Sequence, residues 1–185
     1  MVIENIEGGK RNMKTVLMPT LVAAKNVDSL NASFIDEEND YENGAIIAAG
    51  DYSKEQVYEV AAVSALHNLF MVFSPEDTII TDAAGNEYKI GINDPRTFTN
   101  VKGKVFSAYI PQVGDKILIS AEGIEGTADD FAVAAAGESK LQFASAAVDG
   151  LSYKVLDDSA YISIGGASNI GSQRVAAYLL ECVAI

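Results

Sequence analysis

Short apolar runs separated by turn-forming residues occupy most of this 185-residue chain. Most runs are about 4 to 8 residues long, a length typical of strands and too short for most helices. They are bounded by Gly, Pro, Asn, Asp or Ser, the residues that dominate tight turns. The predicted strands are 45–49, 56–62, 69–73, two within 78–90 joined around 84–86, 105–110, 116–121, 131–134, 140–144, 153–156, 161–164 and 175–183. This pattern predicts a mainly β fold, an antiparallel β-sandwich or barrel-like body with short helical turns.

One segment fits two patterns. Residues 53–56 resemble a helix capping box, and apolar or small residues recur at helical spacing after them. Residues 57–60, however, have the side chains typical of a strand. We favour a strand over 56–62.

The first 26 residues differ from the rest of the chain in charge. They carry the cations Lys10, Arg11 and Lys14, whereas residues 27–51 contain acidic residues and no base. Such asymmetry is typical of an arm beside a folded body. The alternative is a frayed terminus followed by a solvated acidic loop. We predict an extended N-terminal arm over residues 1–26.

A chain of 185 residues is long enough for one substantial core, or for two small cores that share an interface. With 49% hydrophobic and 21% charged residues, the whole chain lacks the low hydrophobicity and high charge of a disordered chain. We therefore predict a single β-rich body over residues 27–185, with 121–131 as the place where that body would subdivide.

The charge and the hydropathy pattern bear on partners. The formal net charge of -13 disfavours nucleic acid, because phosphate contacts need a positive face. No apolar stretch approaches the roughly 18 to 20 residues that cross a bilayer. Glu4 and Glu7 precede any apolar block, so the N-terminus is not expected to be a signal peptide. We expect synthesis in a cytoplasm, without a nucleic-acid or membrane partner.

The chain is poor in the residues that most often carry catalysis. It contains one His, His67, and one Cys, Cys182, so an internal disulfide is not expected. His67 has no second His with which to share a metal, and is expected at the surface or half-buried. Cys182 lies in an apolar run, where a buried and inert thiol is expected.

Two segments resemble ligand sites but lack an essential part. A calcium loop beginning at Asp36 would need Gly and Glu where Tyr41 and Ile47 stand; a looser oxygen site is the alternative to a solvated loop. Residues 166–171 have the glycine spacing of a phosphate loop, but Ser172 follows in place of the lysine that reaches the phosphates.

Adjacent carboxylates occur at Asp129-Asp130 and Asp157-Asp158. Paired carboxylates can act on a sugar, but both pairs stand among Ser, Thr or Ala, where Asp typically forms turns. No Gly-x-Ser-x-Gly elbow is present to activate a serine. We therefore predict a non-enzymatic protein with no catalytic residue, cofactor, metal or small-molecule substrate.

Several segments resemble, in chain order, small head proteins of tailed bacteriophages that are regarded as capsid decoration or cement proteins. Residues 113–124, VGDKILISAEGI, resemble them best. The other matching segments are 43–44, 56–60, 69–76, 93–104 and the Ala/Gly-rich section 131–150, followed by a closing pair of strands. The resemblance covers most of residues 43–185. Phe70 stands near an expected Trp, and residues 1–42 do not match.

The resemblance implies a homo-oligomer on the exterior of the virion, which binds the major capsid protein and stabilises the shell by bridging its subunits. An arm of this kind could add a strand to a coat-protein sheet, with Lys10, Arg11 and Lys14 as the expected partner-binding residues. The alternative is a head-fibre base or a carbohydrate- or host-surface-binding module. The scattered Tyr and Phe and the absence of Trp disfavour a sugar platform.

Overall fold

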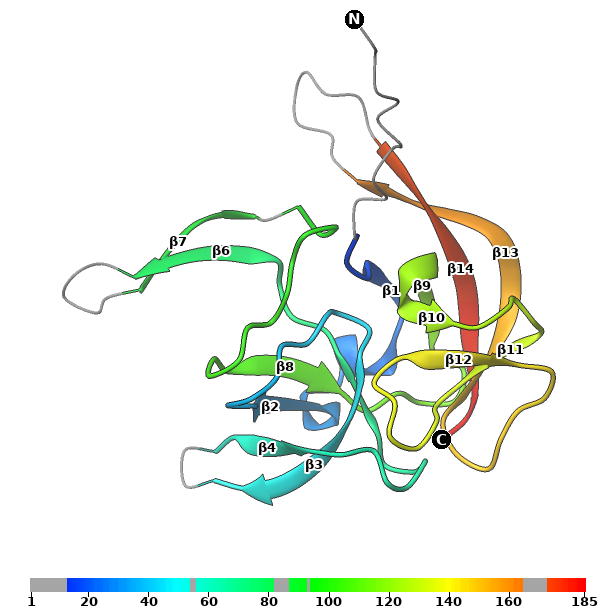
Figure 1. The fold of residues 1–185 in the computed structure, drawn as a ribbon, viewed down its shortest axis with the longest axis horizontal. Coiled ribbons are helices and arrows are strands. Elements are labelled where there is room, and N and C mark those ends of the chain that lie inside the picture. The colour runs from blue at the N-terminus through cyan, green and yellow to red at the C-terminus, as the bar shows by residue number, and fades with distance from the viewer. Residues whose placement is uncertain (1–12, 54–55, 82–86, 93, 165–172) are drawn as a thin grey trace, which may run out of the picture.

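The computed structural model describes residues 13–53, 56–81, 87–92, 94–164 and 173–185. Its strands form a seven-stranded sheet, a closed five-stranded barrel and a separate two-stranded ribbon (Figure 1). Helical structure in these ranges is limited to the 3-10 turns η1 (Ala23–Lys25), η2 (Asp28–Leu30) and η3 (Ala121–Gly123). The predicted mainly β fold with short helical turns is therefore confirmed.

The seven-stranded sheet combines the start of the chain with its second half. In spatial order its strands are β1 (Leu17–Leu21), β9 (Lys116–Ser120), β14 (Gln173–Ala184), β13 (Ser152–Ile164), β11 (Phe131–Val133), β12 (Leu141–Ala144) and β10 (Ile124–Glu125). All neighbours are antiparallel except β10 and β12, which are parallel. Residues 121–131 connect strands of this same sheet.

The barrel is built from strands between residues 31 and 109. Its closed order is β2 (Asn31–Ile35), β4 (Tyr58–Ala61), β3 (Ile46–Tyr52), β5 (Phe70–Val72) and β8 (Phe106–Tyr109). Aromatic side chains fill its interior, where the Phe34 and Phe70 rings pack edge to face at 4.9 Å between centroids. The ribbon of β6 (Asp77–Thr81) and β7 (Glu87–Ile92) extends away from the barrel and the sheet (Figure 1). The turn predicted around 84–86 lies outside the described residues.

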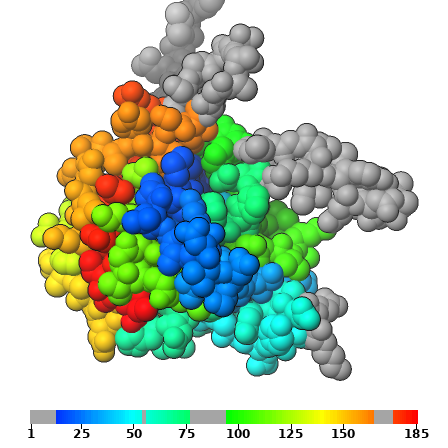
Figure 2. All heavy atoms as spheres, turned by 180° about the vertical axis from the view of Figure 1, so that it is seen from behind, coloured from blue at the N-terminus to red at the C-terminus, as the bar shows by residue number. Residues whose placement is uncertain are grey.

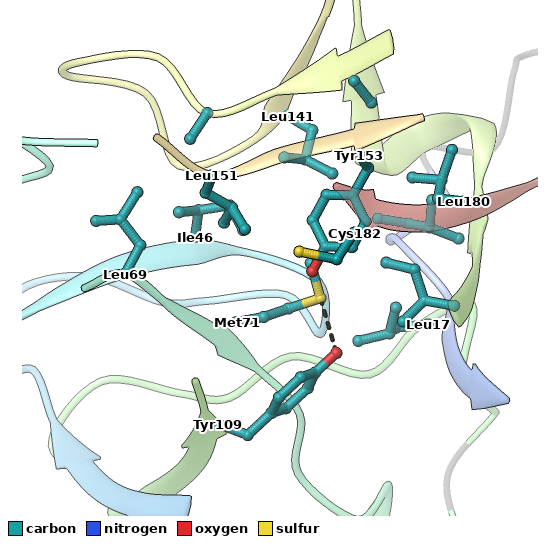
Figure 3. Close-up of a cluster of buried hydrophobic side chains, with 14 of the residues drawn as sticks. Leu17, Ile46, Leu69, Met71, Tyr109, Leu141, Leu151, Tyr153, Leu180 and Cys182 are labelled. Carbon is teal, nitrogen blue, oxygen red and sulfur yellow. Dashed lines mark hydrogen bonds between the residues drawn. The ribbon is translucent and has the colours of Figure 1, made fainter. Parts of the chain in front are cut away.

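One main core lies between the barrel and the sheet. Consecutive residues of a strand point to opposite sides, so Ile46 of β3 enters this main core while Ile47 faces the barrel interior. In β5, Met71 enters the main core between Phe70 and Val72, which face the barrel. These runs are continuously apolar because each strand is buried on both faces. Side chains from both halves of the chain pack together in the main core (Figure 3). There the Tyr109 hydroxyl donates a hydrogen bond to Met71 Sδ at 3.2 Å.

The structure places residues 13–26, the described part of the predicted N-terminal arm over residues 1–26, in the body. Leu17–Leu21 is β1, which pairs with β9. Val16, Leu17, Val22 and Ala24 are each at most 4% exposed. This segment is in the body because burying its apolar side chains favours packing, whatever the charge of the preceding residues. Residues 1–12 lie outside the described residues.

The two strands predicted at 153–156 and 161–164 are one strand, β13. Its pairing with β14 shifts register between Val155 and Asp157, and again between Asp157 and Ala160. Asp157 Oδ1 accepts hydrogen bonds of 2.8 Å from both the backbone N–H and the hydroxyl of Ser159. A bulge lets polar residues stand in a strand without ending it, so this acidic pair lies at an irregularity within a strand and not in a turn.

Candidate functional site

Of the predicted partner-binding cations, the structure describes Lys14; Lys10 and Arg11 lie outside the described residues. The Lys14 ammonium pairs with Glu42 Oε1 at 3.1 Å, and its backbone N–H donates to the Arg96 carbonyl at 2.9 Å. The charge of Lys14 is therefore engaged within the chain. Through its side chain and its backbone, Lys14 holds the start of β1 against Glu42, which precedes β3, and against Arg96, which follows β7.

Glu42 is the centre of this contact. Its Oε2 accepts hydrogen bonds from the Thr15 backbone N–H at 2.9 Å and from the Thr15 hydroxyl at 2.7 Å, and lies 3.7 Å from Lys140 Nζ. Burial alone raises the pKa of Glu42, but the hydrogen bonds from Thr15 and Lys14 and the charge of Lys140 outweigh it, so the pKa is lowered below its ordinary value. The arrangement stabilises the charged carboxylate and joins three distant segments.

This geometry predicts an acid-dependent loss of stability. A carboxyl whose pKa is lowered on folding stabilises the protein above its unfolded pKa, here 4.5, and loses that contribution as the pH falls through the folded pKa. We expect Glu42→Gln to lower Tm at about pH 7 and the difference from the native protein to shrink toward about pH 3. Thermal unfolding across this range, with the exposed Glu59→Gln as control, tests the prediction. Parallel profiles for the native and Glu42→Gln proteins would contradict it.

A buried polar network holds the base of the β6–β7 ribbon. The Asn43 side chain, 2% exposed, accepts from the Ser74 backbone N–H and donates to the Ser74 carbonyl, both at 3.0 Å. Asn100 Nδ2 donates to Asn43 Oδ1 at 3.2 Å, and the Ser107 N–H donates to Ser74 Oγ at 2.9 Å. Ser74 precedes β6 and Asn100 follows β7. The segments that flank the ribbon, at Ser74 and Asn100, are therefore both bonded to the Asn43 side chain. Buried, satisfied networks of this kind fix a unique geometry.

The ribbon itself pairs with no described strand outside its own two. Its backbone register runs from Asp77 opposite Ile92 to Thr81 opposite Glu87. The strand sequences, DTIIT and EYKIGI, are rich in isoleucine. An isolated two-stranded hairpin is marginally stable in water, so an element that projects in this way gains stability when a partner covers it. We take the ribbon and its anchored base as the candidate attachment site.

Asp36 and Asp129, from the acidic segments of the sequence, accept hydrogen bonds from residues that lie close to them in the chain. Asp36 accepts from the backbone N–H groups of Glu38 and Asn39 and from the Tyr41 hydroxyl at 2.8 Å, and Asp129 accepts from the N–H of Asp130. Within the described ranges, no group of three or more His, Cys, Asp or Glu is placed to hold a metal ion. The phosphate-loop-like segment 166–171 lies outside the described residues.

The single His and Cys are apart from the candidate site. His67 is half-exposed, with Nδ1 3.1 Å from the Ile185 carbonyl and Nε2 3.6 Å from Asp149 Oδ1. Cys182 is buried in the main core, and burial raises the pKa of its thiol to about 12, so it is an inert core residue, as predicted. The part of the chain that the structure describes contains no helix long and apolar enough to cross a membrane.

Sequence reasoning missed the Asn43 network. Its members are separated by 31 and 57 positions, and no periodicity links them. Asn43-Gly44 reads as a turn signal, and the positive φ of Gly44 is consistent with that, but nothing local indicates that the Asn side chain is buried. Comparison of the chain with protein-family models, with curated proteins and with solved structures finds no match.

Proposed function

We propose that this protein is a non-enzymatic structural protein that binds the outer surface of a phage capsid and stabilises the shell by bridging major capsid subunits. The observation that carries the proposal is the β6–β7 ribbon, which projects from the body on an anchored base and pairs with no other described strand. The resemblance of residues 113–124 to capsid decoration proteins supplies the identity of the partner. On a shell with many symmetric positions, individually weak contacts of this kind act together.

The strand edges of the ribbon favour attachment through the main chain. A partner strand could pair with an edge of β6 or β7, drawing affinity from backbone hydrogen bonds. The other strand edges are less suitable: the barrel is closed, and β10 at one edge of the sheet has two residues. At the opposite edge, Pro19 of β1 lacks an N–H, and its carbonyl accepts from Lys25 Nζ.

The test is co-sedimentation of the purified protein with mature capsids that lack it, counting bound copies per coat subunit. A variant without the ribbon is made by replacing residues 78–91 with Asn-Gly. Asp77 and Ile92 face each other at the base of the ribbon, so a two-residue turn can join them. The control is Tyr52→Ser on the barrel, where Tyr52 is 59% exposed. We expect the native protein and the control to saturate at one fixed ratio and to raise the thermal resistance of the capsid.

We expect the ribbon variant to remain folded but to lose binding. Full occupancy by this variant would overturn the role of the ribbon while leaving the capsid as partner. No binding by the native protein, or a few copies per particle, would overturn the decoration role and favour a head fibre or host-surface module. Circular dichroism melting of each variant establishes that it is folded.

A further inference from the structure

The face of the seven-stranded sheet that points away from the main core is partly apolar. Ile117, Ile119 and Leu180 enter the main core, so strand alternation places Lys116, Leu118, Leu179 and Glu181 on the opposite side, here called the outer face. The contacts agree with this placement. Leu118 packs against a small separate cluster formed by Val16, Ile162 and Ala177.

Apolar side chains on the outer face are open to solvent. Met18 of β1 is 41% exposed, Leu21 at the end of β1 is 63% exposed, and Leu118 and Leu179 are half-buried. Figure 2 shows this side of the molecule, with β1 in blue beside β9 in green and β14 in red at the surface. An antiparallel sheet that faces water normally carries polar residues on that side. The apolar row therefore indicates a surface that a partner covers.

The register of β9 and β14 makes the outer face complementary to itself. Leu118 stands opposite Leu179, and Lys116 stands opposite Glu181, with Nζ and Oε1 3.9 Å apart. A two-fold axis that runs along the strands between β9 and β14 would lay β9 of one copy on β14 of the other. That operation places Leu118 on Leu179 of the second copy and Lys116 on its Glu181, twice over.

We propose that two copies of this chain associate through their outer faces about this axis. Such an interface is isologous, so each favourable pair occurs twice.

The local charge also favours a second copy. The chain has a net charge of -13, which opposes self-association over most of the surface. On the outer face, Lys116, Glu181 and Lys154 form one row across β9, β14 and β13, and Leu118, Leu179 and Asp157 form the neighbouring row, so two cations balance two anions. Two copies can meet there without net repulsion. The inference is independent of the capsid, and its test uses the purified protein alone.

The test uses two single charge reversals, Lys116→Glu and Glu181→Lys, each of which places like charges both within the chain and across the proposed interface. Each variant alone is expected to raise the Kd of the dimer about tenfold or more. In an equimolar mixture, the heterodimer has two favourable pairs across the interface. The glutamate introduced at position 116 of one chain faces the lysine introduced at position 181 of the other, and the unchanged Glu181 of the first chain faces the unchanged Lys116 of the second. The repulsion within each chain remains. Sedimentation equilibrium from about 1 to 500 µM is expected to detect the restored dimer.

Lys102→Glu is the matched control, because it makes the same change in charge on an exposed loop away from the outer face. It is expected to dimerise like the native protein. Recovery of dimerisation in the mixture, but in neither variant by itself, supports the proposal, because only contacts between chains can produce it. A native protein that stays monomeric throughout this range overturns it, as do reversals that leave the Kd unchanged and a mixture that dimerises no better than its components. Association of the native chain that appears only after residues 1–12 are removed would assign the outer face to that segment and also overturn it.

Discussion

Replacing Gly150 with alanine is expected to lower the free energy of unfolding by about 3 kcal/mol or more. Gly150 has a φ of +139°, and a Cβ there would lie 2.4 Å from the Cβ and 2.5 Å from the carbonyl oxygen of Leu66. These atoms cannot move easily, because the same Leu66 carbonyl accepts the Leu151 N–H at 2.8 Å. The alanine would combine steric overlap with a backbone conformation that L-residues rarely adopt.

Gly137→Ala is the matched control for this prediction. Gly137 also has a positive φ, +83°, but a Cβ there would meet nothing within 4 Å, so only backbone strain of about 1 to 2 kcal/mol is expected. Urea unfolding followed by circular dichroism measures both costs. If the two substitutions prove equally destabilising, the segment around Gly150 does not approach Leu66 as closely as described.

Replacing Tyr153 with alanine is the other substitution expected to be severe, with a cost of about 3 to 5 kcal/mol. Tyr153 is fully buried in the main core (Figure 3), on β13 between Cys182 of β14 and Ala132 of β11. The alanine would leave a cavity among side chains from both halves of the chain. We expect a large decrease in Tm and in the urea midpoint, with the native circular dichroism spectrum retained at low temperature.

Tyr153→Phe separates the ring from the hydroxyl. Within the described structure the Tyr153 hydroxyl has no hydrogen-bond partner, and burial raises the pKa of the group well above its ordinary value. Removing a buried, unpaired hydroxyl is expected to be neutral or stabilising by about 1 kcal/mol. A cost above about 2 kcal/mol would show that the hydroxyl is satisfied in the folded protein.

Most strands could be predicted from the sequence because they bury at least one face. The run at 69–73 is continuously apolar since β5 lies between the barrel interior and the main core, and its length excludes a typical helix. β1 could not be predicted in the same way. Pro19 interrupts its pattern, and it is tolerated because β1 is the edge strand of the sheet.

The sequence by itself determined the mainly β class, the position of most strands and the inert character of Cys182, because side-chain burial and turn chemistry leave local patterns. Only the tertiary structure decided that residues 13–26 belong to the body, that Asn43 holds the segments on both sides of the ribbon, and that Lys116 stands opposite Glu181. These features depend on which distant segments pair and in what register. Register is set by the packing of whole faces and not by the residues of any one strand.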